Sequence, residues 1–406
     1  MTKNKALIEF NGLVTEFHTD GSTVRAVDNI SFTLNKGETI GVVGESGSGK
    51  SVTSLSAMRL VPSPPGKISS GEIIFHKNES TSVNLLSLSE ENMRSYRGND
   101  LAMIFQEPMT SLNPVFTCGN QVVEAIMLHQ KLNSKEAKDL AIDLFKKVEL
   151  PDPERIFNTY PHQISGGQKQ RVMIAMAMSC KPSVLIADEP TTALDVTVQK
   201  TILELMQDLQ KEYEMGIIFI THDLGVIAEL ADKVVVMYKG KIVEQGNVWD
   251  IFTKPKHPYT KGLLACRPPL NKRYKFLPTV SDFMQVDSSG NVIDNKISVK
   301  DFTKKIIVSD KERKERLVNL YKKEPILKVQ NLKTYFPIKK GFFGGTSGYV
   351  KAVDNISFDV YPKETLGLVG ESGCGKTTTG RTILRLEEPM SGKMIYKGVD
   401  IASMSA

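Results

Sequence analysis

The octapeptide GESGSGKS at Gly44–Ser51 constrains the fold of this chain more than any other segment, because it fits the pattern G-x-x-x-x-G-K-[ST]. Glycines let a loop adopt positive φ angles, so its backbone N–H groups can converge on phosphate oxygens at the start of the next helix. The apolar run TIGVV precedes the loop and the helical pattern SVTSLSAMRL follows it. This strand, loop and helix predict an α/β domain that binds a nucleotide.

The loop also predicts individual contacts. We expect Lys50 to reach the β- and γ-phosphates and Ser51 to offer its hydroxyl oxygen to Mg²⁺. The predicted nucleotide-binding residues of the loop are Gly44, Glu45, Ser46, Gly47, Ser48, Gly49, Lys50, Ser51 and Val52. A single match could be a chance glycine-rich turn, with a probability on the order of one per cent in a chain of this length. A second match in the same chain excludes that reading.

The second match belongs to a partial repeat. The string AVDNISF occurs at Ala26–Phe32 and at Ala352–Phe358, and GESGCGKT begins at Gly370, so both motifs recur after 326 residues. Each strand–helix–strand unit takes about 30 residues, whereas the second copy runs only from Ile326 to Ala406. We therefore expect the sequence to stop inside a second domain. Its predicted nucleotide-binding residues are Gly370, Gly373, Gly375, Lys376, Thr377 and Thr378, with Thr377 also a predicted Mg²⁺ ligand.

Apolar runs alternate with helical patterns through the first copy. The predicted strands are Thr39–Val43, Leu101–Phe105, Ser183–Ala187, Ile217–Ile220 and Lys233–Tyr238, and the predicted helices include Ser134–Val148, Gln168–Met178 and Val196–Glu212. Shorter strands, antiparallel in type, are expected at Ile8–Phe17, Ile30–Leu34 and Ile73–Phe75. The predicted fold class is α/β, a P-loop nucleotide-binding domain with a mainly parallel core sheet, an antiparallel β subdomain and a helical subdomain.

Two carboxylates end one of these strands, in the run SVLIADE at Ser183–Glu189. We expect Asp188 to hold the hydration shell of Mg²⁺ and Glu189 to act as the base that polarises the attacking water. Acidic residues after a strand also occur in solvated turns, so this run alone leaves both interpretations open.

Further along the chain, HQISGGQKQR at His162–Arg171 resembles the signature loop of ATP-binding cassette proteins, with Ile164 where leucine is more usual. Gln106 in IFQEPMTSLNP resembles the Q-loop glutamine of that family, Asp195 in TTALD its D-loop aspartate and His222 in FITHD its switch histidine. The order and spacing of these motifs also match the family, over Ile8 to about Arg267 and again from Ile326.

The resemblance implies an ATPase that uses ATP and Mg²⁺. The implied catalytic residues are Glu189, His222, Gln106 and Lys50, and the implied Mg²⁺ ligands are Ser51, Gln106, Asp188 and Thr377. Further nucleotide contacts are implied for Ser165, Gly166, Gly167 and Gln168, which open a helix whose N-terminal dipole can meet a γ-phosphate, and for Asp195. In this family a nucleotide lies between the phosphate loop of one domain and the signature loop of another. A second cassette domain, in another chain or a homodimer, is therefore an implied partner.

Phe17 is a candidate for the aromatic ring that stacks on adenine in such domains. It precedes the phosphate loop and aligns with Phe336 of the second copy. A core aromatic on an edge strand explains it equally well.

Two features resemble the peptide-importer branch, whose ATPases serve dipeptide, oligopeptide, glutathione and nickel permeases. One is QEPMTSLNP after the Q-loop glutamine, and the other is HPYTKGLL at His257–Leu264, followed by Pro268–Pro269. From chemistry alone, HPYT would be an ordinary helix start that contains proline, with Tyr259 as a surface anchor. The only cysteine in this tail is Cys266, so we expect no iron–sulfur cluster there.

Composition favours a chain that stays in the cytosol, and the resemblance to importer ATPases implies a peripheral position on the cytoplasmic face of the cell membrane. No apolar stretch approaches the roughly 20 residues that span a bilayer, the N-terminus lacks an apolar signal core, and the four cysteines are scattered. The net charge of +6 arises between Arg267 and Pro325, which hold 14 Lys/Arg and 8 Asp/Glu, so nucleic acid is not an expected partner. The implied partners are integral-membrane permease subunits and, indirectly, a peptide-binding protein.

The expected organisation is a complete cassette at 1–267, a linker at 268–325 and the start of a second cassette at 326–406. The helical subdomain should cover about 110–165 and the HPYT tail should begin at 257. The linker shows a strand–turn–strand pattern at Thr279–Ile293, with its turn at Ser288–Asn291, and a charged helix with Ser309 and Glu312 spaced as a capping box.

Two other readings stay open at this stage. One is a soluble tandem-cassette ATPase that acts on ribosomes or nucleic acid, although Pro278 and the strand pattern interrupt the long charged helical linker typical of such proteins. The other is a non-functional truncated fragment.

Overall fold

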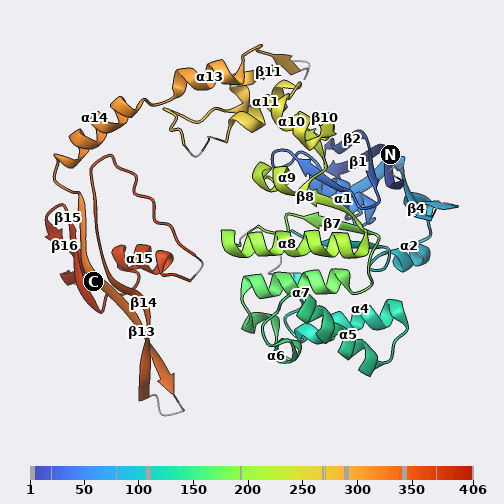
Figure 1. Ribbon diagram of the computed structural model, residues 1–406, viewed down its shortest axis with the longest axis horizontal. Coiled ribbons are helices and arrows are strands. Elements are labelled where there is room, and N and C mark those ends of the chain that lie inside the picture. The colour runs from blue at the N-terminus through green and yellow to red at the C-terminus, as the bar shows by residue number, and fades with distance from the viewer. Residues whose placement is uncertain are drawn as a thin grey trace. The chain divides into compact units, whose positions relative to one another are not determined.

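The structure is a computed structural model that describes residues 5–19, 21–78, 80–106, 111–192, 194–267, 269, 271–287, 292–340, 345–371 and 373–404. The chain divides into two compact units, whose elements are labelled in Figure 1. The first comprises Met1–Leu194, Val198–Leu270 and Phe276–Ile306, and the second comprises Asp195–Thr197, Asn271–Lys275 and Ile307–Ala406. The segment predicted as one linker is thus divided between the two units.

A six-stranded sheet forms the centre of the first unit, with strand order β10-β9-β3-β8-β7-β6. Its strands are β3 (Thr39–Val43), β6 (Leu101–Ile104), β7 (Val184–Asp188), β8 (Gly216–Ile220), β9 (Lys233–Tyr238) and β10 (Lys241–Asn247). All neighbours are parallel except β10, which pairs antiparallel with β9. Every residue of β3, β7 and β8 is buried, as expected when both faces of a parallel sheet are covered. The predicted α/β fold with a mainly parallel sheet is confirmed.

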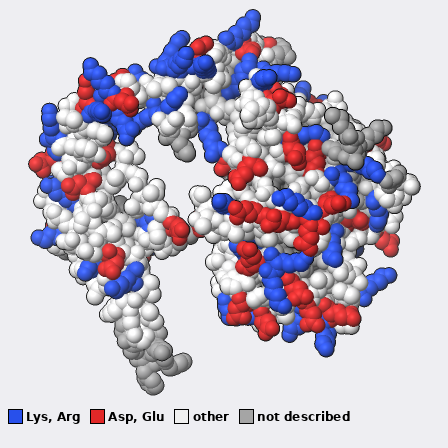
Figure 2. Space-filling model, in the orientation of Figure 1, with Lys and Arg blue, Asp and Glu red and all other residues white. Residues whose placement is uncertain are grey.

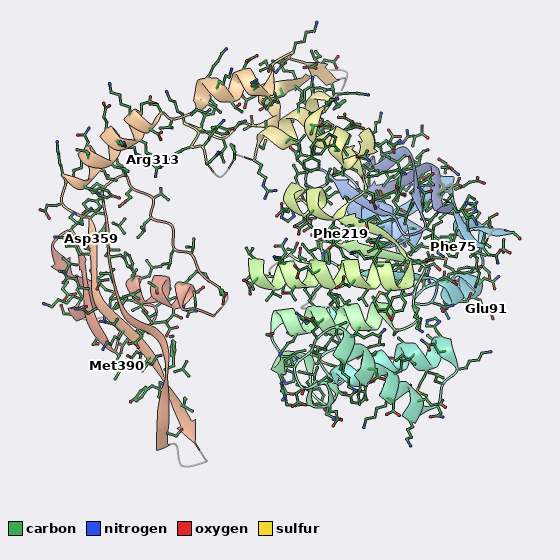
Figure 3. The ribbon with its side chains drawn as sticks, in the orientation of Figure 1. Phe75, Glu91, Phe219, Arg313, Asp359 and Met390 are labelled. Atoms are coloured by element: carbon green, nitrogen blue, oxygen red, sulfur yellow. The ribbon has the colours of Figure 1, made fainter. Side chains whose placement is uncertain are left out.

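The two faces of this sheet pack against different cores. On β7, Leu185 and Ala187 contribute to one core and Val184 and Ile186 to the other, because successive side chains of a strand point to opposite faces. Figure 3 labels one phenylalanine of each core, Phe219 and Phe75.

Helices supply the first core. They are α4 (Cys118–Gln130), α5 (Ser134–Lys147), α7 (Gly166–Met178), α8 (Val196–Tyr213) and α9 (Leu224–Leu230), and the short helix α6 (Pro153–Phe157) and turn η2 (Pro161–Gln163) lie between α5 and α7 in the chain. The ring of Phe157 packs against Gly119, where an added Cβ would lie 2.2 Å from the ring. Helices α4, α5 and α6 lie within the range predicted for the helical subdomain, about 110–165.

An antiparallel sheet covers the other face, with order β2-β1-β4-β5. Its strands are β1 (Ala6–Thr19), β2 (Ser22–Asn35), β4 (Gly66–Asn78) and β5 (Thr81–Asn84). Phe10 of β1 and Phe32 of β2 stack with ring centroids 4.3 Å apart, and both belong to this second core. Helices α1 (Lys50–Ala57) and α2 (Glu90–Tyr96) and turn η1 (Leu85–Ser87) complete this side.

A tail follows the cassette core and packs on the first unit. It contains α10 (Val248–Thr253), α11 (Pro258–Ala265), α12 (Val280–Phe283), the antiparallel pair β11 (Met284–Val286) and β12 (Val292–Asp294), and α13 (Val299–Ile306). The predicted pair of strands is present as β11 and β12, but the first residues of the predicted first strand, Val280–Phe283, form helix α12, capped through Thr279 and Asp282. The predicted turn at Ser288–Asn291 and the residue Pro268 lie outside the described residues, as do residues 107–110 of the QEPMTSLNP segment.

The second unit contains α14 (Asp310–Tyr321), which begins at the predicted Ser309–Glu312 capping box. Its sheet has order β14-β13-β15-β16, with β13 (Leu327–Lys340), β14 (Gly345–Val360), β15 (Ser391–Tyr396) and β16 (Val399–Asp400). Helix α15 (Lys376–Ile383) and turn η3 (Ile401–Ser403) complete it. Val329, Leu332, Val353 and Met394 form its small core.

One apolar run of the second unit, Thr365–Val369, forms no strand. Leu368 and Val369 of this run are 50% and 89% exposed. In the first unit the equivalent β3 is hydrogen-bonded to β8 and β9. No described strand of the second unit pairs with Thr365–Val369, so the run lacks strand partners among the described residues and its apolar side chains are exposed.

Among the helices that the structure describes, none has the length and apolar character needed to cross a membrane.

Candidate nucleotide site

The loop Gly44–Ser51 joins β3 to α1. At two of its positions the neighbouring backbone lies so close that only glycine fits. A Cβ on Gly44 would lie 2.2 Å from the carbonyl oxygen of Met237, and one on Gly49 would lie 2.2 Å from that of Ala26. Gly49 also has φ of 99°, a conformation that other residues rarely adopt. Ser46 and Gly47, at the tip of the loop, are exposed, so an anion can approach the loop from solvent.

Lys50, the first residue of α1, is buried and its side chain folds back over the loop. Its Nζ donates to the carbonyl oxygens of Gly44 at 2.8 Å and Glu45 at 2.9 Å. Burial lowers the pKa of Lys50, while the carboxylates of Glu189 and Asp188 act in the opposite direction. The ammonium thus lies where the loop and the acidic strand end meet.

Asp188 ends β7 and is buried beside the loop. The hydroxyl of Ser51 donates to its carboxylate, and burial raises the pKa of Asp188. The Oδ1 atom of Asp188 has no hydrogen-bond partner among the described residues. A buried carboxylate oxygen without a partner, next to a hydroxyl, is the kind of oxygen donor set that Mg²⁺ binds. These two residues therefore fit the predicted ion.

Glu189 follows Asp188 and lies at the centre of a small polar cluster. Its Oε2 accepts a hydrogen bond from the hydroxyl of Thr192 at 2.9 Å, and its Oε1 lies 3.3 Å from Nδ1 of His222. Burial raises the pKa of Glu189, but hydrogen bonds from Thr192, His222 and Gln106 outweigh this effect and lower it overall. The carboxylate is consequently ionised at neutral pH and can accept a proton.

The backbone of Glu189 also has an unusual conformation, with φ of 47°. A residue with a Cβ adopts this region at a cost of about 1–3 kcal/mol, and such residues concentrate at functional sites. The structure therefore brings together Gln106, Glu189 and His222 from three distant segments, at the carboxyl ends of strands β6, β7 and β8.

The predicted signature residues lie at the start of α7. Ser165 is the N-cap of this helix and forms a capping box with Gln168, whose side chain accepts the backbone N–H of Ser165 at 3.0 Å. Gly166 and Gly167 form the first turn, and a Cβ on Gly167 would lie 2.8 Å from Val198. Within the described part of the chain, no hydrogen bond or ion pair joins Ser165 to the phosphate loop. Asp195 directly precedes α8.

Phe17 lies near the end of β1, where it pairs with Val24 of β2 and Gly66 of β4. It is half-buried, and an added Cβ on Gly66 would lie 3.0 Å from its ring. Both readings of Phe17, adenine contact and edge-strand packing, fit this position.

The second loop repeats the geometry of the first. Lys376 begins α15, and its Nζ donates to the carbonyl oxygens of Gly370 at 2.7 Å and Glu371 at 2.6 Å. A Cβ on Gly375 would lie 2.1 Å from the carbonyl oxygen of Ala352, and Gly373 has φ of 81°. Thr377 and Thr378 lie in the first turn of α15.

One residue beside the loop was not predicted to lie there. Tyr259 of α11 is fully buried, and its hydroxyl oxygen accepts a hydrogen bond from the backbone N–H of Glu45 at 2.8 Å. The interpretation of Tyr259 as a surface anchor is therefore wrong. His257 is the N-cap of α11 and Pro258 occupies its first turn, so the HPYT segment begins a helix as expected.

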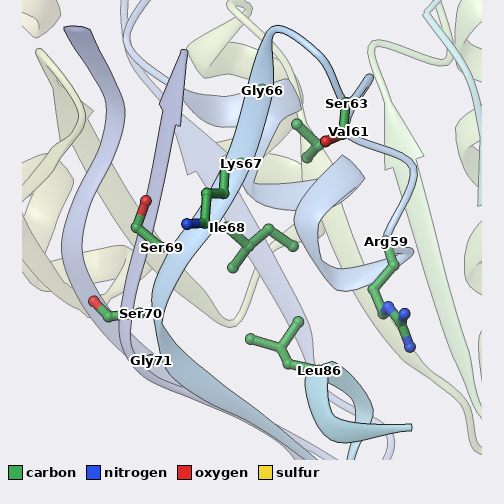
Figure 4. Close-up of a pocket in the computed structure, with 10 residues that line it drawn as sticks. All are labelled: Arg59, Val61, Ser63, Gly66, Lys67, Ile68, Ser69, Ser70, Gly71 and Leu86. Atoms are coloured by element: carbon green, nitrogen blue, oxygen red, sulfur yellow. The ribbon is translucent and has the colours of Figure 1, made fainter. Parts of the chain in front are cut away.

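A separate surface hollow of about 370 Å³ lies on the first unit and is shown in Figure 4. Its walls come from β4, the segment after α1 and turn η1, with Lys67, Arg59 and Leu86 among them. None of the predicted nucleotide-binding residues lines it, so it is not the candidate site.

The parallel sheet, the phosphate loop at the end of β3 and the acidic end of β7 define a P-loop nucleotide-binding domain. The family model described as "ABC transporter" matches residues 27–192 and 353–406, and that described as "Oligopeptide/dipeptide transporter, C-terminal region" matches residues 243–285. The chain therefore belongs to the ABC transporter family. The resemblance inferred from the signature loop and from HPYT is confirmed.

Curated relatives and solved structures agree with this assignment. The chain is 47% identical over 404 residues to the "Glutathione import ATP-binding protein GsiA" of Salmonella choleraesuis (strain SC-B67), covering 99% of this chain and 62% of the relative. It is 48% identical over 397 residues to that of Escherichia coli O157:H7, covering 96% of this chain and 60% of the relative. The structure titled "Dimeric Structure of MJ0796, a Bacterial ABC Transporter Cassette" matches at 25% identity with a TM-score of 0.53, covering 60% of this chain and 99% of the other. The chain spans less than two thirds of the length of these curated relatives.

Proposed function

We propose that this chain supplies an ATP-binding and ATP-hydrolysing cassette that energises the import of a peptide-like solute, such as glutathione, a dipeptide or an oligopeptide, through a membrane permease. The observation that carries this proposal is the convergence of Lys50, Asp188 and Glu189 at one end of the parallel sheet, together with the tail at 243–285. The names of the relatives supply the class of solute.

Each polar group of the cluster has a distinct task in this proposal. Lys50 exchanges its loop carbonyls for phosphate oxygens, and Ser51 and Asp188 hold Mg²⁺, which neutralises phosphate charge when bound. Glu189 accepts the proton of the attacking water, since its carboxylate is ionised. His222 and Gln106 orient that carboxylate through their contacts with it.

We further propose that the cassette works as a pair, with Ser165 of one domain facing Lys50 of another, in a second chain or a second copy. Within the described residues no hydrogen bond or ion pair joins the phosphate loop to Ser165, and the related cassette structure is dimeric by its title. Pairing predicts that the specific ATPase rate rises with protein concentration. A rate that is independent of concentration would contradict this pairing.

The permease is proposed to contact the surface between the Q-loop and α5, as part of a peripheral assembly on the cytoplasmic face of a membrane. Val115 and Phe116 precede α4 and are 69% and 53% exposed, and Leu128 at the end of α4 is 74% exposed. Exposed apolar side chains of this size mark protein interfaces when they cluster.

The alternative of a soluble tandem-cassette ATPase on ribosomes or nucleic acid is less well supported. The match to the oligopeptide/dipeptide transporter region and the importer names of the relatives favour transport. On the face shown in Figure 2, acidic and basic side chains are interspersed over the first unit instead of forming one basic surface.

The test is co-purification of the chain with permease subunits, followed by ATPase assays and solute uptake in proteoliposomes with the binding protein present. ATP-dependent uptake of a labelled glutathione or peptide is expected, and uptake should disappear with Glu189→Gln. Robust ATPase activity that associates with ribosomes, with no permease bound, would support the alternative instead.

A further inference from the structure

The tail contributes a hydrogen bond to the phosphate loop from 214 positions away in the chain. Tyr259 on α11 is 0% exposed, and its hydroxyl accepts the backbone N–H of Glu45 at 2.8 Å. Its ring packs against Tyr238 of β9, with ring centroids 4.5 Å apart. The loop and the tail also share the walls of a cavity of about 650 Å³, which is lined by Glu45, Tyr238 and residues of α12 and β11.

The backbone N–H and the carbonyl oxygen of Glu45 have different hydrogen-bond partners. Its N–H donates to Tyr259, whereas its carbonyl oxygen accepts from Lys50 Nζ at 2.9 Å and from the N–H of Ser48 at 3.1 Å. When Lys50 turns to a phosphate, it gives up the carbonyls of Gly44 and Glu45. The hydrogen bond to Tyr259 does not depend on Lys50 and can persist through that exchange.

Tyr259 is itself fixed by contacts that do not involve the loop. Nδ1 of His257 accepts the N–H of Tyr259 at 3.2 Å and caps α11. The carboxylate of Glu244 accepts the N–H groups of Lys256 at 2.8 Å and His257 at 3.0 Å. At the other end of the helix, a Cβ on Gly262 would lie 2.9 Å from Cα of Val280, so α11 and α12 are in close contact.

We propose that Tyr259 is a positioning residue for the phosphate loop. Its hydroxyl holds the Glu45 amide so that the loop keeps its phosphate-binding shape when Lys50 leaves the loop carbonyls. The transporter-specific tail thereby sets the affinity of the cassette for nucleotide. This inference rests on the proposed function only in that the nucleotide is ATP.

The main test compares Tyr259→Phe with Tyr238→Phe. The first removes only the hydroxyl that accepts from Glu45, and the second removes the neighbouring hydroxyl, for which the described residues provide no hydrogen-bond partner. An unmade buried hydrogen bond weakens the state that needs it by about ten-fold. Tyr259→Phe should therefore raise KM for ATP about ten-fold with kcat within two-fold of the unsubstituted protein, and Tyr238→Phe should change neither.

A second readout separates positioning from simple loss of stability. ATP raises the melting temperature of a protein that binds it, by an amount set by its affinity. A purely structural Tyr259 would lower the melting temperature with and without ATP by the same amount. The positioning role predicts a smaller ATP-induced rise in Tyr259→Phe than in Tyr238→Phe. Equal rises together with an unchanged KM would overturn the inference.

The same hydrogen bond can be removed from the donor side if Tyr259→Phe does not fold. Glu45→Pro lacks the N–H, whereas Glu45→Ala keeps it and loses only the side chain. KM should be higher in Glu45→Pro than in Glu45→Ala, and equal values would contradict the proposal. A direct measurement of ATP binding by the unsubstituted chain distinguishes failure of the proposed ATPase function from failure of the proposed role of Tyr259. If that chain binds ATP without hydrolysing it, the proposed function fails and the binding comparison still tests Tyr259.

Discussion

Glu189→Gln tests the central assignment of the site, because it changes the charge of one group and almost nothing else. Glutamine keeps an acceptor oxygen for His222, which lies 3.3 Å from Oε1 of Glu189. The hydroxyl of Thr192, now a donor at 2.9 Å, can rotate and accept from the new amide instead. The fold and the nucleotide pocket should therefore survive the substitution.

The expected loss is in the rate of hydrolysis. The hydrogen bonds that lower the pKa of Glu189 keep the carboxylate ready to accept a proton, and the amide cannot do so. A positioned general base contributes about 10²–10⁴-fold to a rate, which corresponds to about 3–5 kcal/mol of activation free energy. The ATP-bound dimer should accumulate, since binding and pairing are retained while turnover is not.

The assay is phosphate release at saturating Mg-ATP, combined with nucleotide content after gel filtration. Glu214→Gln provides a matched control, because it makes the same chemical change at a 70% exposed side chain paired with Lys36. The control should hydrolyse ATP at the normal rate. Normal turnover by Glu189→Gln, or failure of that variant to bind ATP, would refute the assignment of Glu189 as the base.

Three further predictions concern binding, packing and pH. Lys50→Ala should abolish ATP binding or hydrolysis, because it removes the ammonium that we propose meets the phosphates, and equilibrium binding of labelled ATP measures this loss. Phe219→Ala should lower the free energy of unfolding by about 3–5 kcal/mol in urea titrations, since this ring is 1% exposed in the helical core. Burial and, to a smaller extent, the positive charge of Lys261 lower the pKa of His257 below 6.5. The carboxylates of Glu244 and Asp294 act in the opposite direction. The folded state thus binds fewer protons than the unfolded state, so this stabilisation is present above pH 6.5 and is lost as the pH falls through the lowered pKa. His257→Asn keeps a cap without this titration, and its melting temperature should depend less on pH over the same range.

The parallel sheet could be predicted almost residue by residue, because its strands are buried on both faces. The predicted strands Thr39–Val43 and Lys233–Tyr238 start and end at the same residues in the structure, as β3 and β9. Strand β10 was not predicted, since it lies at the sheet edge and mixes exposed and partly buried residues. At the segment from Thr279 the error is the opposite one, because a strand was predicted where the structure has a helix. Its β-branched residues indicate a strand, but the cap formed by Thr279 and Asp282 starts helix α12.

Thr365–Val369 shows that an apolar run forms a strand only when another strand accepts its hydrogen bonds. Its sequence, TLGLV, is nearly that of β3, TIGVV, and the loop after it has the same lysine contacts as the first loop. The difference lies in the neighbours, because β3 pairs with β8 and β9, and no described strand pairs with residues 365–369. A local motif therefore fixes the loop geometry, while the sheet depends on residues far away in the chain.

The candidate site shows the same difference between local motifs, which the sequence reveals, and contacts between distant residues, which it does not. Lys50, Ser51, Asp188 and Glu189 could be predicted as candidates because each lies at a fixed offset from a strand end, where a parallel sheet collects functional groups. Tyr259 could not, because nothing within α11 indicates that its hydroxyl meets a backbone N–H of the phosphate loop. Its aromatic ring and helical position are equally typical of packing against a core. The chemistry of this tyrosine follows from the amide of Glu45, a group present in every residue type except proline, and so it has no sequence pattern of its own. Contacts of this kind, between a side chain and distant backbone, become visible only when the fold is known.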